Sequence, residues 1–145
     1  MPKKGRSQSA LTSQPANDVT ELVVRAAGAA SSKKAENIVI LDVSRQLVIT
    51  DFFLICSGNT ERHVGTIAEE IERRLQQQQS VKPVRREGER HRRWVVLDYI
   101  DFVVHVFHKE DRDYYELERL WADAREVPFE DQWEDGNEPA AAEAT

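Results

Sequence analysis

The chain has a single cysteine among its 145 residues, and it lacks any apolar run long enough to cross a membrane. One cysteine excludes an internal disulfide, which is typical of proteins in a reducing compartment. The first 17 residues are largely polar and have no apolar stretch of the kind found in secretory signals. We therefore expect a cytoplasmic protein without a membrane partner.

Positive charge is scarce at the C-terminal end of the chain. Residues 109–145 carry 4 Lys and Arg against 13 Asp and Glu, whereas residues 1–108 carry 16 against 13. The net charge of −6 therefore comes from the C-terminal end. Residues 129–145 and 1–17 are also poor in apolar side chains, so we expect an acidic disordered C-terminal tail and a disordered N-terminal tail. A domain at residues 18–128 remains, large enough for one modest core.

Apolar residues recur at helical spacing in three segments. The first helix, expected to end near Ser31, is marked by Val19, Leu22, Val23, Ala26, Ala27 and Ala30. The second is marked by Val64, Ile67, Ala68, Ile71 and Leu75, and its apolar pattern stops at the glutamine run at 76–79. The third helix carries Tyr114, Leu117, Leu120 and Trp121.

Five shorter segments are rich in β-branched and aromatic residues, which is typical of strands. They lie at residues 37–43, within 49–57, at 82–86, at 95–97 and at 102–107. The polar residues 44–47 predict a turn between the first two strands. The order of helix, two strands, helix, three strands and helix favours an α/β fold, with a mixed five-stranded sheet and flanking helices.

The segment SGNTERH, at residues 57–63, is a candidate phosphate site. A strand that turns through Gly58 into a helix presents backbone N–H groups, as a phosphate site requires. The same residues also suit any turn from strand to helix, because glycine permits the turn and Asn59 or Thr60 caps the helix. A single glycine falls short of a dinucleotide or P-loop signature.

Asp98 and Asp101 raise the question of a magnesium site. Their three-residue separation places the two carboxylates on opposite faces of a strand, unless a turn at Tyr99 and Ile100 brings them together. His105 and His108 have the same separation, and no second pair of ligands accompanies them. We expect no metal and no cofactor.

Cys56 is a further candidate for a catalytic role. Cys56 lies in an apolar strand and is most simply a small buried hydrophobe. A dyad with His63 or His105 stays open as an alternative. His105 is itself more typical of a core or interface histidine.

A basic stretch follows at residues 82–93. Five of its arginines are candidates for RNA contact: Arg85, Arg86, Arg90, Arg92 and Arg93. No aromatic RNA-binding motif or recognition helix accompanies them, so an independent RNA-binding domain is not indicated. The alternative is a solvated hairpin loop centred on Gly88.

Four motifs in order carry a resemblance to a known family. KKAENIVILDV, ITDFFLICSGNTERHV, WVVLDYIDFVVHVFH and DRDYYELERLW resemble the Iojap family, the bacterial ribosomal silencing factors, over about residues 19–123. The resemblance implies a nucleotidyltransferase-like fold without catalytic carboxylates, and binding rather than catalysis. It also implies a partner, the large ribosomal subunit, contacted through large-subunit ribosomal protein fourteen. Occupying that face would block joining of the small subunit and lower translation when nutrients are short.

Matching motif to motif assigns the partner-facing role to one segment. The residues are Trp94, Leu97, Asp98, Tyr99, Asp101 and His105. An aromatic anchor with acids suits a basic ribosomal protein. Other interpretations stay open, because Leu97 and His105 would also suit a core, and Asp98 with Tyr99 would also shape a turn.

The chain departs from the family pattern at Ile100, where members commonly have glycine. Because a β-branched residue disfavours positive φ, a continuous or bulged strand, which would move Asp98 and Asp101 apart, is the alternative to a turn at Tyr99 and Ile100. The competing function is a nucleotidyltransferase-like enzyme, with a nucleotide at Ser57-Gly58-Asn59. An exposed strand edge would permit a homodimer as well as a monomer.

Overall fold

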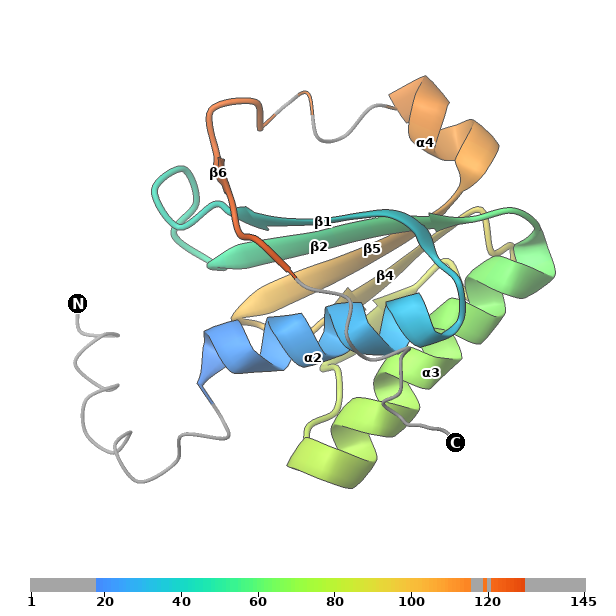
Figure 1. The fold of residues 1–145 in the computed structure, drawn as a ribbon, viewed down its shortest axis with the longest axis horizontal. Coiled ribbons are helices and arrows are strands. Elements are labelled where there is room, and N and C mark those ends of the chain that lie inside the picture. Colours follow the sequence, from blue (N-terminus) through green and yellow to red (C-terminus); the bar gives the residue numbers. More distant parts are fainter. Residues whose placement is uncertain (1–17, 116–118, 120, 130–145) are drawn as a thin grey trace.

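The computed structural model describes residues 18–115, 119 and 121–129. These form one mixed sheet with helices on both sides (Figure 1). The elements are α2 (Val19–Ser32), β1 (Glu36–Asp42), β2 (Phe52–Gly58), α3 (Glu61–Gln79), β3 (Arg85–Glu87), β4 (Trp94–Asp98), β5 (Phe102–His108), α4 (Lys109–Tyr115) and β6 (Arg125–Glu126). The strand order is β3-β4-β5-β2-β1-β6.

The mixed α/β architecture is confirmed, but the predicted strand number is wrong, because the described residues form a sheet of six strands rather than five. Strand β2 runs parallel to β5, and the remaining neighbours are antiparallel. The extra strand, β6, pairs with β1 through only two exposed charged residues, Arg125 and Glu126. Two charged residues are too few to show the alternation of apolar and polar side chains from which a strand is predicted.

The last predicted helix is only partly covered by the structure. Helix α4 begins at Lys109 and is described to Tyr115, so it includes the backbone of Tyr114. Leu117 and Leu120 lie outside the described residues. Trp121 stands in a turn rather than in a helix.

Helices α2 and α3 cover one face of the sheet, while α4 and residues 121–124 lie over the other (Figure 1). Each of the two covering helices starts at a side-chain cap. Asp18 accepts a hydrogen bond from the Thr20 N–H, and Thr60 accepts one from the His63 N–H. Caps of this kind satisfy backbone donors that the first helical turn leaves unpaired.

The core is divided by the sheet into two clusters. The larger one lies under α2 and α3 and includes Leu54, Leu97, Phe102 and Val104. The smaller one, on the opposite face, is built from Leu41, Val43, Phe53, Ile55 and Phe107. Strand β2 contributes to both and is buried throughout its length, as expected for a central strand.

The connection between β4 and β5 is a tight turn at Tyr99 and Ile100, so the alternative of a continuous or bulged strand is wrong. The Asp101 N–H donates to the Tyr99 carbonyl across Ile100, whose φ is 74°. This φ is typical of a strained γ-turn, and it costs a non-glycine residue about 1–3 kcal/mol. The Tyr99 N–H also donates to the Phe102 carbonyl, and the Ile100 N–H donates to Asp98. Local hydrogen bonds thus hold Ile100 in a conformation that its β-branch disfavours.

Replacing Ile100 by glycine is expected to raise the free energy of unfolding by about 1 kcal/mol, because glycine adopts positive φ without a Cβ clash. The isoleucine is 56% exposed, so its removal sacrifices little burial. Urea unfolding followed by circular dichroism should show a higher midpoint with an unchanged slope. Val84→Gly is the matched control, since Val84 is 60% exposed and has no positive φ, and its midpoint should fall. An I100G midpoint no higher than that of V84G would show that the turn is unstrained.

Candidate docking surface

Strand β4 alternates strictly between its two faces. Val95 and Leu97 are buried toward the helices, whereas Trp94, Val96 and Asp98 are half-buried on the other side. The antiparallel register places Val96 beside His105 and Asp98 beside Val103. We call this surface the open face, and its partly exposed residues are Trp94, Val96, Asp98 and Val103.

Trp94 is held in place by a buried histidine. Its indole N–H donates to Nδ1 of His105 over 3.1 Å, and its ring stacks on Phe107 at a centroid separation of 4.6 Å. His105 is only 8% exposed and meets the Phe53 ring edge-on at 4.9 Å. Because Nδ1 accepts, a neutral ring carries its proton on Nε2. His105 therefore lies beneath the open face and positions Trp94.

Burial lowers the pKa of His105 to about 4. The cause is desolvation, which disfavours the charged imidazolium form of the ring. The ring is neutral at physiological pH, which keeps the Trp94 hydrogen bond intact.

The structure does not bring Leu97 and Tyr99 to the open face. Leu97 is fully buried in the cluster beneath α2 and α3. Tyr99 is 7% exposed and stacks on Phe102 at 4.8 Å in the same cluster, and burial raises the pKa of its hydroxyl. The alternation of β4 gives the signal that Val96, rather than Leu97, shares a face with Trp94.

Asp98 and Asp101 flank the β4–β5 turn, and each takes part in local hydrogen bonds. Asp98 accepts from Arg85 at 3.1 Å and from the Ile100 N–H at 2.8 Å. The Asp101 carbonyl accepts from the Asp51 N–H, which joins this turn to the start of β2. Across the described part of the chain, no three His, Cys, Asp or Glu side chains gather as metal ligands would.

The other candidate catalytic or ligand side chains have structural partners or are buried. His108 accepts from the Glu110 N–H at the start of α4, while His105 is bonded to Trp94, so the two do not converge. Cys56 is fully buried, and this burial raises the pKa of its thiol to about 12. Its prediction as a small buried hydrophobe is confirmed.

The turn at residues 57–59 has its own internal hydrogen bonds. The Asn59 N–H donates to Nδ1 of His63 over 2.9 Å, and His63 Nε2 lies 2.7 Å from the Lys33 carbonyl. A Cβ on Gly58 would lie 3.0 Å from the Val64 nitrogen, so the glycine permits close packing of the strand on α3. This geometry favours the structural interpretation over phosphate binding, because the Asn59 amide is already used.

Four of the five arginines proposed for RNA contact form ion pairs. Arg85 pairs with Asp98 (3.1 Å), Arg86 with Glu72 (2.9 Å), Arg92 with Glu69 (3.8 Å) and Arg93 with Asp111 (2.7 Å). Arg90 is exposed and has no ion pair within the described residues. The stretch is therefore less positive than its sequence suggests.

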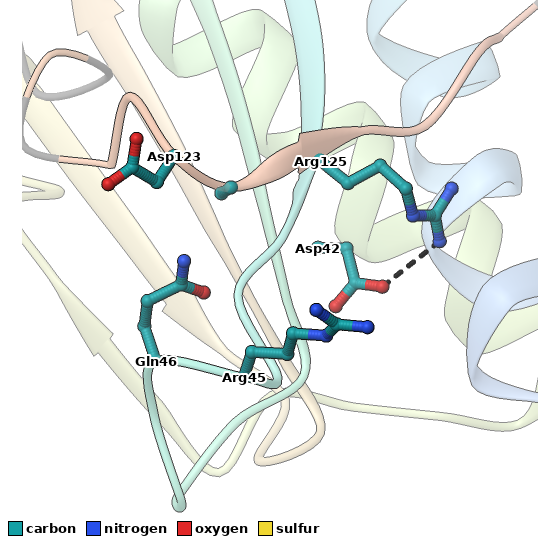
Figure 2. A pocket seen from close by; sticks show the side chains of 6 residues that line it. Asp42, Arg45, Gln46, Asp123 and Arg125 are labelled. Atoms are coloured by element: carbon teal, nitrogen blue, oxygen red, sulfur yellow. Dashed lines mark hydrogen bonds and ion pairs between the residues drawn. The ribbon is translucent and has the colours of Figure 1, made fainter.

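A polar pocket of about 350 Å³ lies at the far edge of the sheet (Figure 2). Asp42 and Arg45 line it on one side and Asp123 and Arg125 on the other. Burial works against ionisation of Asp42, but hydrogen bonds from Ser44 and Arg125 hold its pKa below the usual value. The 3.0 Å pair between Asp42 and Arg125 fastens β6 to β1.

Comparisons with known proteins give a consistent result. A family model described as "Ribosomal silencing factor during starvation" matches residues 16–145. A ribosomal silencing factor from Halalkalibacterium halodurans is 47% identical over 110 residues, covering 76% of this chain and 93% of that protein. The corresponding Bacillus subtilis protein is 44% identical over 99 residues, covering 68% and 83%. A Chromobacterium violaceum crystal structure superposes with a TM-score of 0.70 at 29% identity, covering 77% of this chain and 92% of that one.

The stability of the protein should depend on pH through His105. The pKa of this ring is 6.5 in the unfolded chain and about 4 in the fold, so protons below pH 6.5 bind preferentially to the unfolded state. The contribution of the neutral ring to the free energy of unfolding is fully present above pH 6.5. It is lost as the pH falls toward 4, and the total loss is about 3 kcal/mol.

Urea unfolding at several pH values tests this prediction. The variant His105→Asn keeps an acceptor for Trp94 but does not titrate, so its stability should fall less than the parent's between pH 6.5 and 4. His91→Asn, at an exposed histidine, should follow the parent. Parallel curves for the parent and H105N would show that His105 is not the linked group.

Proposed function

The chain belongs to the ribosomal silencing factor family, and on that premise we propose that it binds the large ribosomal subunit through large-subunit ribosomal protein fourteen. Binding there blocks association with the small subunit and represses translation under nutrient limitation. This mechanism is steric, so it requires a rigid contact surface and no catalytic group.

The open face carries this proposal. Trp94, Val96 and Val103 are partly exposed on paired strands, so a partner meets a preformed surface rather than a loop. Preformed interfaces bind without large backbone movement. Tryptophan is also one of the residue types enriched at interface hot spots.

Charge supports the same partner. Asp98 lies on the open face and Asp101 in the adjoining turn, both partly exposed. A basic ribosomal protein would find complementary carboxylates beside an apolar centre, an arrangement that favours encounter and orientation. We assign contact to Trp94, Asp98 and Asp101, with Val96 and Val103 added.

The remaining predicted residues support the surface from behind. His105 holds the Trp94 indole by a hydrogen bond, and Leu97 and Tyr99 fill the core beneath β4 and the turn. The arginines of residues 85–93 retain an auxiliary role toward rRNA, because exposed ion pairs contribute only about 0–1 kcal/mol and phosphates compete with them. Among the described helices, none is long and apolar enough to cross a membrane.

Sedimentation of purified ribosomal subunits tests the proposal. The parent protein should reduce the joined-ribosome peak without added nucleotide. Val96→Glu should bind large subunits more than about tenfold more weakly, because disrupting a central interface residue costs about 2 kcal/mol or more. Val24→Glu is the matched control, at a partly buried valine of α2 on the helix side, and it should act like the parent if its melting curve is similar. Equal activity of V96E and the parent would remove the open face from the mechanism.

A further inference from the structure

Three large aliphatic side chains are exposed at one end of the sheet. Val48 is 93% exposed, Ile49 is 79% exposed and Ile100 is 56% exposed. Isolated exposed aliphatics are ordinary, but neighbouring ones form patches that commonly mark interaction sites. We call this group the apolar rim.

The sheet register brings the segment that carries Val48 and Ile49 next to the turn that carries Ile100. Strands β2 and β5 pair in parallel from Phe52 and Phe102, and the Asp51 N–H donates to the Asp101 carbonyl over 2.9 Å. The chain entering β2 therefore runs alongside the β4–β5 turn. Continuing that register puts Thr50 opposite Ile100, with Ile49 and Val48 immediately before it.

The apolar rim is continuous with the open face. Asp98, at the end of β4, accepts a hydrogen bond from the Ile100 N–H, so the surface passes directly from the strand to the turn. A protein seated on β4 and β5 would need to extend only past this turn to reach Ile49.

The charges around the apolar rim indicate what kind of partner fits. Asp51 and Asp101 are partly exposed, and neither side chain has an ion pair within the described residues. A second copy of this chain would bring like carboxylates together, and anionic lipid would meet the same repulsion. A basic protein surface with apolar side chains at its centre suits both the aliphatics and the carboxylates.

We propose that Val48, Ile49 and Ile100 form a second contact for the same basic ribosomal protein that docks on the open face. The partner's apolar side chains cover the rim, and its Lys or Arg side chains pair with Asp51 and Asp101. This inference rests on the proposed function, which it extends from one face of the sheet around its end.

Binding of the full-length protein to purified large subunits, measured by pelleting, tests the inference. The double variant Val48→Ser/Ile49→Ser should bind at least about tenfold more weakly, since burying each aliphatic contributes about 1.5–3 kcal/mol when complete. Its melting temperature should match the parent's, because neither side chain packs in the core. Val24→Ser is the control, at a partly buried valine of α2 on the helix side, and it should bind like the parent. Asp51→Asn/Asp101→Asn should weaken the dependence of binding on salt.

The outcomes separate this inference from the proposed function. If the parent and the rim variant bind equally while V96E does not bind, the rim is not a contact and the proposed function stands. If the parent itself fails to bind, both ideas fail. Loss of dimers in the rim variant without loss of subunit binding would assign the rim to a second copy instead. Rim-dependent pelleting with phosphatidylcholine–phosphatidylglycerol vesicles, at unchanged subunit binding, would assign it to lipid.

Discussion

The parallel pairing of β2 with β5 is the constraint on which the rest of the structure depends. It runs from Phe52–Phe102 to Gly58–His108 and places the two most buried strands at the centre of the sheet. A parallel pair cannot be joined by a hairpin, so the chain must cross over a face between them, and α3 occupies that crossover. The same pairing sets the loop before β2 beside the β4–β5 turn. The apolar rim follows from this register, whereas the open face follows from the antiparallel pairing of β4 with β5.

A second constraint is the position of His105, an uncharged histidine that lies beneath the Trp94 side chain of the open face. His105 is surrounded by Phe53, Trp94 and Phe107, so burial holds it neutral. Only a neutral ring offers Nδ1 as an acceptor to the Trp94 indole. Trp94 therefore loses little side-chain freedom when it meets a partner, which lowers the entropic cost of binding. The histidine contributes by positioning rather than by contact.

Local patterns in the sequence predict most of the fold but less of the surface. Helices α2 and α3 and five strands follow from periodicity, and the alternation of β4 is sufficient to separate Trp94 and Val96 from Leu97. Strand β6 was not predictable, since two charged residues become a strand only because β1 offers a free edge. The ion pairs of Arg86 with Glu72 and of Arg93 with Asp111 join residues distant in sequence, so the basic stretch appeared freer than it is. The positive φ of Ile100 is not predictable from its residue type, because hydrogen bonds on both sides of the turn outweigh the preference of isoleucine for negative φ.

At position 100, the residue type that best suits the turn differs from the residue that the chain has. Glycine would satisfy this turn without strain, and isoleucine gains little from burial because it is more than half exposed. Strained backbone positions persist where the surrounding structure over-determines them, and they cluster at functional surfaces. Val48 and Ile49 are exposed beside it without benefit to the core. Three aliphatics that fail to stabilise the free protein, gathered next to the open face, are most simply explained by a partner that covers them. On this view the turn's strain is tolerated because Ile100 contributes to binding rather than to folding.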